Sequence, residues 1–476
     1  MRVLFVASEG LPYIKSGGLA DVIGSLPHNL SNDQTSVEII MPLYQKIIDK
    51  YLAKLEYVFT IEINQGIFRT NARIFQHNNN GVVTYFVENQ EYFERSQLYG
   101  YGDDGARFAF FQHAVMNFIL QQKNNYDIIH CHDWHSGMIA VLGKTLYQWH
   151  DKIKNLKYVY TIHNLAFQGN FPTSVLTDCF GLTLDLMADN SVNFHDGMSF
   201  MKGGIFYSDK VTTVSETYAN EILTKEFGEQ MDYVLDLKRA DLIGIVNGID
   251  IKLWNPNTDK ALAYKYSKNS LVNKAKNKLA LQCEYGLSNN KDVPMIALVS
   301  RLTDQKGLQL IVDKIEDLLK LNLQLFFLGS GDSKYEDIFK YLEGKYDNFV
   351  FYRGYNEILA HQIYAASDFF LMPSYFEPCG ISQLIAMRYG SLPIVRETGG
   401  LKDTVSPYNK YELSGEGFTF SNFDSTEMYY AIIRALELFV DNNIYQRIQI
   451  NAMSKRVSWN QSAKKYRQLY QSIIKS

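Results

Sequence analysis

The chain has 476 residues and a formal net charge of −4, with 46% hydrophobic and 21% charged residues. This length corresponds to about two to three globular domains, and the composition is ordinary for a globular enzyme. The weakly acidic balance excludes a general basic field for nucleic acid or for an anionic membrane surface.

No apolar stretch approaches the roughly 20 residues that a membrane-spanning helix needs. The N-terminal apolar run reaches Glu9 too early for a signal peptide. The four cysteines, at positions 131, 179, 283 and 379, have no C-x-x-C spacing. This pattern predicts reduced thiols in a cytoplasmic protein, with neither disulfides nor a zinc site.

The first strand, predicted over residues 3–7, runs into a loop with Glu9, Lys15 and Gly17. A helix is expected to begin at Gly18. A strand followed by a Gly-Gly turn and a helix start is typical of a phosphate cradle, because unpaired backbone N–H groups face the anion. Further strands of this half are predicted over residues 37–41, 83–87, 127–130, 157–161 and 209–214.

A loop rich in tyrosine and glycine, residues 99–105, precedes a helix predicted from Ala106. Its composition fits a surface Ω-loop as well as a ligand-binding loop that would use Tyr99. Ser215 is expected to cap a helix that begins at Glu216.

His130 ends the fourth predicted strand, and Cys131, His132, Asp133 and His135 follow it. Such a cluster raises the question of a metal site. We reject it, because alternate residues of a strand point to opposite faces and do not converge on one ion.

His163 and Asn164 follow the strand over residues 157–161, ahead of a loop that contains glycine. A lone histidine is more often structural than catalytic, but a strand end before a glycine loop favours a functional role. Asn247-Gly248 marks the change of domain, since an Asn-Gly turn permits positive φ.

The second half opens with a strand over residues 294–299, whose following loop carries Arg301 and Lys306. Two cations on a strand-to-helix loop predict a phosphate clamp. Gly329 ends the strand over residues 325–328. Tyr355 follows the strand over residues 349–352, where it is placed either to stack on a base or to pack within its loop.

The strand over residues 368–372 leads to Glu377, Cys379 and Gly380, and a helix is predicted to begin near Ile381. Free N–H groups at this helix start would face the crevice at the strand ends, where open α/β sheets bind ligands. Glu377 is either a carboxylate stabilised by the helix dipole or a functional group, and the local sequence leaves both open.

Residues 377–380 (Glu-Pro-Cys-Gly), 398–401 (Thr-Gly-Gly-Leu) and 15–22 (Lys-Ser-Gly-Gly-Leu-Ala-Asp-Val) resemble the motifs of bacterial glycogen synthases and plant starch synthases. The resemblance covers nearly the whole chain. Gly203 is a small departure, because the family more often has Lys-Ala-Gly there. The resemblance implies two doubly wound, Rossmann-like α/β domains facing a cleft, the GT-B architecture, which agrees with the alternating strands and helices.

On this basis we expect an N-terminal domain over residues 1–245 on the acceptor side and a C-terminal domain over residues 246–456 on the nucleotide-sugar donor side. The last segment, residues 457–476, is expected to form a helix that crosses back to the first domain. We expect Asn247-Gly248 to act as the hinge of domain closure.

The resemblance implies a glycogen synthase, a retaining hexosyltransferase that moves glucose from ADP-glucose to the non-reducing 4-hydroxyl of an α-1,4-glucan. No Asp-x-Asp string is present to hold a divalent metal on the diphosphate. Fixed cations and helix starts are therefore expected to stabilise the leaving group, without a metal or cofactor. Ile385 stands where some related transferases carry a second glutamate, which favours the glycogen synthase subgroup.

We assign catalytic roles to the charged and imidazole groups of both domains: Lys15, Asp133, His163, Arg301, Lys306 and Glu377. Asp133 and His163 would bind the sugar, the cations would hold the diphosphate, and Glu377 would face the developing positive charge. We assign substrate binding to Glu9, Gly17, Gly18, Tyr99, Asn164, Asn247, Gly329, Tyr355, Cys379, Gly380, Thr398, Gly399, Gly400 and Leu401.

Three alternatives stay open: a UDP-glucose-dependent synthase, a glucan phosphorylase and a non-catalytic glucan-binding protein. A phosphorylase would need a lysine Schiff base to pyridoxal phosphate, for which we find no motif. The complete set of predicted catalytic residues argues against a non-catalytic protein. No residue discriminates ADP-glucose from UDP-glucose on physical grounds.

Overall fold

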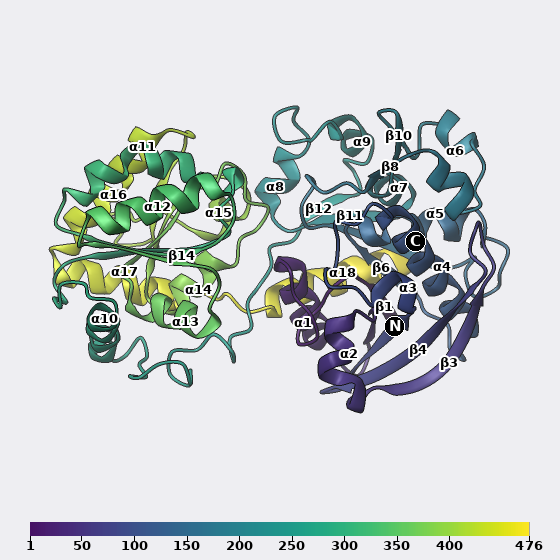
Figure 1. Cartoon of the computed structure of the whole chain (residues 1–476), viewed down its shortest axis with the longest axis horizontal. Helices are drawn as coiled ribbons and strands as arrows, with labels where there is room; N and C mark the ends of the chain where they lie inside the picture. The colour runs from purple at the N-terminus through teal and green to yellow at the C-terminus, as the bar shows by residue number, and fades with distance from the viewer. Residues whose placement is uncertain (476) are drawn as a thin grey trace. The chain divides into compact units, whose positions relative to one another are not determined.

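A computed structural model describes residues 1–475, which divide into two compact units (Figure 1). Unit 1 comprises Met1–Asn247 and the chain from Trp459 onward, and unit 2 comprises Gly248–Ser458. The predicted boundaries after residues 245 and 456 each lie two residues before these. The last residue of the predicted C-terminal segment, Ser476, lies outside the described residues.

Unit 1 is built on a nine-stranded sheet of order β12-β11-β7-β6-β1-β2-β5-β4-β3. Its strands are β1 (Arg2–Val6), β2 (Ser36–Pro42), β3 (Glu56–Ile63), β4 (Thr70–Asn79), β5 (Val82–Glu88), β6 (Ile128–His132), β7 (Lys157–Ile162), β11 (Lys210–Thr213) and β12 (Leu242–Gly244). A small second sheet pairs β8 (Asn170–Phe171), β10 (Gly197–Ser199) and β9 (Asn193–Phe194). After Arg2, the central strand β1 is a continuous run of buried apolar residues, as expected of a parallel strand covered on both faces.

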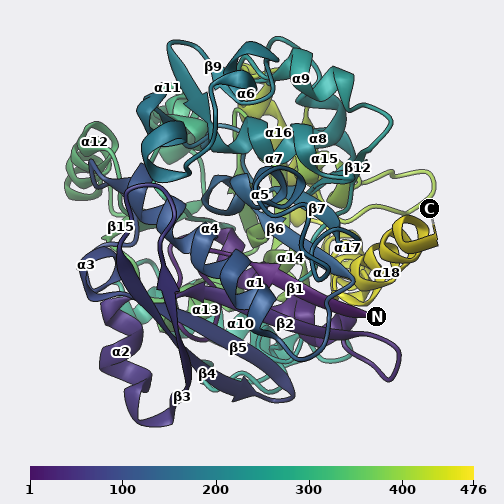
Figure 2. The same cartoon turned by 90° about the vertical axis from the view of Figure 1, so that its right-hand side faces the viewer.

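The chain winds outward from β1 in both directions. β1 pairs in parallel with β2 on one side and with β6 on the other, so the strand order reverses between β1 and β6. Only β4 runs antiparallel within this sheet, to β3 and β5, which lie side by side with it in Figure 2. The crevice of unit 1 is therefore expected where the loops after β1 and β6 meet.

The helices of unit 1 are α1 (Gly18–Leu30), α2 (Gln45–Tyr51), α3 (Gln90–Phe93), α4 (Asp104–Gln121), α5 (Met138–Lys144), α6 (Asp185–Ala188), α7 (Phe200–Tyr207), α8 (Glu216–Glu221), α9 (Asp232–Leu237) and α18 (Asn460–Lys475). The amphipathic helix α18 joins unit 1 because it buries Tyr466, Tyr470 and Ile473 on one face. The Tyr470 hydroxyl lies 2.6 Å from Nδ1 of His130 on β6, which fixes the helix beneath the sheet.

Unit 2 is a six-stranded parallel sheet of order β15-β14-β13-β16-β17-β18. Its strands are β13 (Met295–Val299), β14 (Gln324–Gly329), β15 (Phe349–Arg353), β16 (Phe369–Met372), β17 (Leu392–Arg396) and β18 (Phe418–Phe420). The chain moves outward from β13 to β15 and then returns to β16 beside β13. The strand order therefore reverses between β13 and β16.

Helices cover both faces of this second sheet (Figure 1). They are α10 (Val272–Glu284), α11 (Leu308–Leu319), α12 (Ser333–Lys345), α13 (Glu357–Ala366), α14 (Ser382–Arg388), α15 (Gly399–Thr404), α16 (Ser425–Phe439) and α17 (Asn442–Ser454). Both units are thus doubly wound α/β sheets, as predicted. No helix within the described residues is long and apolar enough to cross a membrane.

Several local predictions are confirmed, and others are wrong. The Ser215 side chain accepts a hydrogen bond from the Tyr218 N–H and caps α8, as expected. Asn247 and Gly248 do not adopt the positive φ that the Asn-Gly pair allows. The strand predicted to end at His130 continues to His132, and the β3–β4 hairpin was not predicted at all.

Candidate active site

The crevice of unit 2 contains an ion pair between the loops that follow β13 and β16. The Lys306 ammonium lies 2.6 Å from Oε2 of Glu377, and the Ser374 hydroxyl donates to the same oxygen over 3.0 Å. Only 5% of Glu377 is exposed. A carboxylate buried to this extent needs such partners to offset its lost hydration. The structure thus brings together two of the predicted catalytic residues.

Gly307 lets these two loops approach each other. It adopts φ +67 and precedes α11. A Cβ at this position would lie 1.9 Å from the Pro373 carbonyl oxygen, so only glycine fits against the β16 loop. Its neighbour Lys306 is thereby placed beside Glu377.

Gly399 and Gly400, at the start of α15, pack directly on the Glu377 loop. A Cβ on Gly399 would lie 2.0 Å from the Glu377 carbonyl oxygen, and one on Gly400 would lie 2.2 Å from that of Cys379. The Gly400 N–H also donates to the Glu377 carbonyl over 3.0 Å. The two glycines therefore shape the loop that carries Glu377, in addition to their predicted contact with substrate.

The remaining predicted residues of unit 2 lie around the same strand ends. Gly380 has φ +70 and α14 begins at Ser382, close to the predicted Ile381. Thr398 occupies the N-cap of α15. Those not yet described are Cys379 and Leu401, which are buried, Gly329, which ends β14, and Arg301 and Tyr355, which are exposed.

The crevice of unit 1 joins three segments through Ser8, the second residue after β1. Its hydroxyl lies 2.9 Å from the Tyr99 hydroxyl and 3.1 Å from Nδ1 of His135. The neighbouring Glu9 is 3% exposed, and its carboxylate accepts hydrogen bonds from the N–H groups of Ser16 and Gly17. Burial raises the pKa of Glu9, although these N–H groups oppose the shift. Glu9 thus holds the glycine loop in place.

Asp133, the first residue after β6, has an unusual backbone. Its φ of 55 and ψ of −178 belong to a region that is almost exclusive to glycine, and such strain is concentrated at functional sites. Its Oδ1 accepts the His163 N–H over 2.7 Å. Burial raises the pKa of Asp133 to about 7, because the desolvation of the carboxylate outweighs the N–H groups of His163 and Asn164.

His163 is held from a second side by His132, whose Nδ1 lies 3.0 Å from Nε2 of His163. Burial lowers the pKa of His163 to about 3, so its imidazole is neutral near pH 7. Asn164 turns its side chain back to accept the Ala166 N–H over 3.1 Å. The unit 1 crevice therefore offers a neutral imidazole beside a carboxylate that titrates near neutrality.

The expectation that the histidines of this strand point to opposite faces is wrong for His130 and His132. His130 and His132 lie on the same face of β6, with ring centroids 4.2 Å apart, because residues two apart on a strand share a face. Both ring nitrogens of His130 already have partners, Tyr470 and Thr161, each at 2.6 Å. No metal-binding group of three such side chains is found within the described residues.

Two further predicted residues of unit 1 have other partners or none in the described part of the chain. Lys15 is half-exposed and pairs with Asp21 at 2.8 Å, near the start of α1 at Gly18. Asn247 is buried, and its Oδ1 finds no hydrogen-bond partner among the described residues.

The sequence pattern gave no site role to Ser8, His135 or Ser374, which complete the two crevices, although His135 was considered and rejected as a metal ligand. Ser8 and Ser374 are the second residues after β1 and β16, the strands that border the two switch points. A search for polar residues at strand ends beside a reversal of strand order would have found both.

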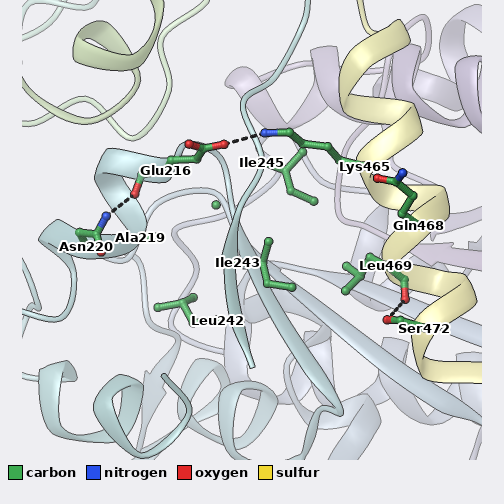
Figure 3. Close-up of a pocket in the computed structure, with 11 residues that line it drawn as sticks. Glu216, Ala219, Asn220, Leu242, Ile243, Ile245, Lys465, Gln468, Leu469 and Ser472 are labelled. Carbon is green, nitrogen blue, oxygen red and sulfur yellow. Dashed lines mark hydrogen bonds and ion pairs between the residues drawn. The ribbon is translucent and has the colours of Figure 1, made fainter. Parts of the chain in front are cut away.

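The cavity shown in Figure 3 lies elsewhere in unit 1, between α8, β12 and α18. It encloses about 580 Å³ and is crossed by an ion pair between Lys465 and Glu216 at 2.6 Å. No predicted site residue lines it. We therefore do not assign it to the active site.

Comparison with known proteins gives full-length matches. Residues 2–237 match the family model described as the starch synthase catalytic domain, and residues 293–438 match that described as glycosyl transferases group 1. Proteins named glycogen synthase are similar over their whole length. That of Clostridium kluyveri is 46% identical over 475 residues, covering 100% of both chains, and that of Clostridium perfringens is 47% identical over 480 residues, covering 100% of this chain and 99% of the relative.

A solved structure, the catalytic domain of Starch Synthase IV from Arabidopsis thaliana bound to ADP and acarbose, matches with a TM-score of 0.92 and 35% identity. The match covers 100% of this chain and 99% of that one.

Proposed function

Because this chain belongs to the glycogen and starch synthase family of glycosyltransferases, we propose that it transfers glucose from ADP-glucose to the non-reducing 4-hydroxyl of an α-1,4-glucan, with retention of configuration. The observation that carries the proposal is the Lys306–Glu377 pair at the switch point of unit 2. It supplies a fixed cation for a diphosphate and a buried carboxylate for a developing carbocation. The ADP bound by the related starch synthase supports the choice of donor.

The nucleotide binds to unit 2 in this proposal. The Arg301 guanidinium, exposed on the β13 loop, binds phosphate oxygens through its fork of N–H donors, and Lys306 adds a second positive charge. The exposed ring of Tyr355 stacks on the base. These groups are part of the folded unit before the donor binds, so leaving-group stabilisation requires no added metal.

Lys306 has two competing partners in the reaction. Without donor, its ammonium is held by Glu377 at 2.6 Å. A bound diphosphate draws Lys306 toward itself and leaves the Glu377 carboxylate with less compensation. The negative charge of the Glu377 carboxylate then stabilises positive charge on the anomeric carbon. This interaction is stronger in the transition state than in the ground state.

The bond changes balance without an added reactant. The bond between the anomeric carbon and the phosphate oxygen breaks, and its electron pair leaves with ADP. The glucan 4-hydroxyl oxygen bonds to the anomeric carbon on the same face, which retains the α-configuration. Its proton passes to the departing phosphate oxygen, which lies on that face.

Unit 1 supplies hydrogen bonds to the glucosyl group and the glucan. The neutral imidazole of His163 and the carboxylate of Asp133 bind sugar hydroxyls, and Tyr99 lines the acceptor side. A neutral imidazole suits this role because a second positive charge beside the anomeric carbon would oppose the reaction. The free state of the four cysteines supports a cytoplasmic location.

The direct test is incubation of the purified protein with ADP-glucose or UDP-glucose in the presence of glycogen, measuring nucleotide release. We expect glycogen-dependent release of ADP, and new α-1,4 linkages by NMR of the glucan. Release of UDP alone would reassign the donor. The absence of nucleotide release from either donor, or β-linked product, would overturn the proposal.

A further inference from the structure

The loop that carries Glu377 is held by its backbone carbonyls. Six carbonyl oxygens between residues 374 and 380 accept hydrogen bonds from other elements. The donors are Arg396 for Ser374 and Tyr375, Gln305 for Phe376, the Gly400 N–H for Glu377, and Gln383 for Cys379 and Gly380. Three of these donors are side chains to which the sequence gives no role.

Arg396 is the last residue of β17 and is 9% exposed. Its Nη1 donates to the carbonyls of Ser374, over 3.4 Å, and Tyr375. The guanidinium also lies over the rings of Tyr375 and Phe423, at 5.9 Å and 5.7 Å from their centroids. Cation–π contacts and hydrogen bonds therefore fix the same group from two directions.

Gln305, the chain neighbour of Lys306, forms hydrogen bonds to the loop that carries Glu377. Its Nε2 donates to the Phe376 carbonyl over 3.3 Å, and its own carbonyl accepts the Tyr375 N–H over 2.9 Å. Lys306 is the next residue in the chain. Gln305 thus couples the position of the Lys306 loop to that of the Glu377 loop.

Gln383, on α14, is fully buried. Its Nε2 lies 3.0 Å from the carbonyls of Cys379 and Gly380, and also 3.0 Å from Oγ1 of Thr404. A Cβ on Gly380 would come within 2.6 Å of the Gln383 side-chain oxygen. The close fit explains why a glycine with positive φ follows Cys379.

We propose that Gln305, Gln383 and Arg396 are positioning residues, which keep Glu377 in register with Lys306 and act on turnover through Glu377. This inference rests on the proposed function. Loops are ordinarily the mobile part of a fold, and a shift of about 1 Å in a reacting group costs about 10²-fold in rate. Donors from three separate elements hold this loop through its backbone carbonyls.

The test uses Gln305→Met, which keeps the length of the side chain and the backbone carbonyl but removes the Nε2 donor. Its matched control is Gln309→Met in α11, where the exposed glutamine donates only to Asp313 at 2.7 Å. We expect kcat to fall about tenfold in Gln305→Met, with the ADP dissociation constant within about twofold of the wild type. The control should change neither quantity.

Arg396 provides a second, graded comparison. Arg396→Met should lower kcat by about 10²-fold. Arg396→Lys keeps a cationic donor near the Tyr375 carbonyl and should recover about tenfold of that loss. A role limited to overall stability would lower the melting temperature without this rescue of kcat.

Amide hydrogen exchange over residues 374–380 gives a readout that does not depend on activity. We expect faster exchange there in Gln305→Met and unchanged exchange in Gln309→Met. Unchanged kcat and unchanged exchange in Gln305→Met would overturn the inference, as would an equal loss of kcat and ADP affinity. A wild-type protein that releases no nucleotide would instead overturn the proposed function, while the exchange experiment still decides whether Gln305 holds the loop.

Discussion

The two units share a doubly wound topology but differ in the groups that compensate their buried carboxylates. Each has a switch point in strand order, and in each the loops after the two flanking strands meet. In unit 2 the buried carboxylate of Glu377 is paired with a cation, Lys306. In unit 1 the buried carboxylates of Glu9 and Asp133 are satisfied by backbone N–H groups, and the nearby imidazole of His163 is neutral.

This difference matches the two kinds of ligand in the proposed reaction. A leaving diphosphate needs positive charge, which lysine and arginine side chains supply. A sugar has hydroxyl groups, which need hydrogen-bond donors and acceptors but no net charge. The shared fold therefore provides the position of each crevice, while the residues of the loops set its chemistry.

The largest effect is expected from Glu377→Gln, which breaks the ion pair but keeps the shape. We expect kcat to fall about 10²–10³-fold, because the charge that favours the transition state is lost. ADP should bind at least as tightly, since Lys306 is released from Glu377. Steady-state kinetics and calorimetric titration measure the two effects.

The control for this variant is Glu316→Gln, which removes a surface pair with Lys345 at 2.7 Å. Such exposed pairs contribute about 0–1 kcal/mol, so neither activity nor binding should change. A near-normal kcat in Glu377→Gln would remove Glu377 from the mechanism.

The next largest effect tests the packing beneath the unit 2 crevice. A Cβ on Gly400 would lie 2.4 Å from the Cys379 Cα, where backbone cannot easily yield. We expect Gly400→Ala to lower kcat by about 10²-fold by displacing Glu377. Gly344→Ala in α12 meets no atom within 4 Å and should instead raise stability by about 0.5–1 kcal/mol. Similar kinetics in the two variants would contradict the packing argument.

In unit 1, Asp133→Asn removes the carboxylate while keeping a hydrogen-bond acceptor. We expect kcat to fall about tenfold, as for a lost charged hydrogen bond. Wild-type kcat/KM should rise with pH through the Asp133 pKa of about 7, since the ionised carboxylate accepts sugar hydroxyls more strongly. The variant should lose this inflection. Its persistence would assign the titration to another group.

The same variant makes a prediction for stability. The Asp133 pKa is raised from 3.8 to about 7 in the folded protein, so between these values the folded state binds the extra proton and stability falls as pH rises. At about pH 8 the free energy of unfolding of Asp133→Asn should therefore exceed that of the wild type by up to about 4 kcal/mol. This difference in stability should nearly vanish at about pH 4. A gap that does not depend on pH would contradict the raised pKa.

The smallest effect on turnover is expected from removal of divalent metal ions. Because Arg301 and Lys306 provide fixed positive charge, we expect EDTA to leave turnover unchanged. Loss of activity with EDTA and its recovery with magnesium would show that the cations of unit 2 do not suffice for the diphosphate.

The sequence predicted the buried parallel strands well because they are short apolar runs closed by turn residues, as at β1 and β16. It did not predict the β3–β4 hairpin, whose half-exposed strands mix polar and apolar residues at the sheet edge. The Asn247-Gly248 pair permits positive φ, but neither residue adopts it in the structure.

The residues of the candidate site, too, could be predicted only in part from the sequence. Glu377 and Lys306 were identified from motifs, and the structure brings them together. Gln305 and Arg396 were not identified, because they act on backbone carbonyls that become neighbours only through the strand order of the folded sheet. A linear sequence does not carry this information.

The central claim is that nucleotide binds through unit 2 and that unit 1 contributes to turnover. Calorimetric titration of ADP into Lys306→Ala and Lys15→Ala, beside their kinetics, tests it most directly. Lys306→Ala should weaken ADP binding by about 10–100-fold, the value of a charged hydrogen bond. Lys15, which has Asp21 as its partner at 2.8 Å, should affect kcat and leave ADP affinity nearly unchanged. Equal losses of ADP affinity in the two variants would contradict the division of roles between the units.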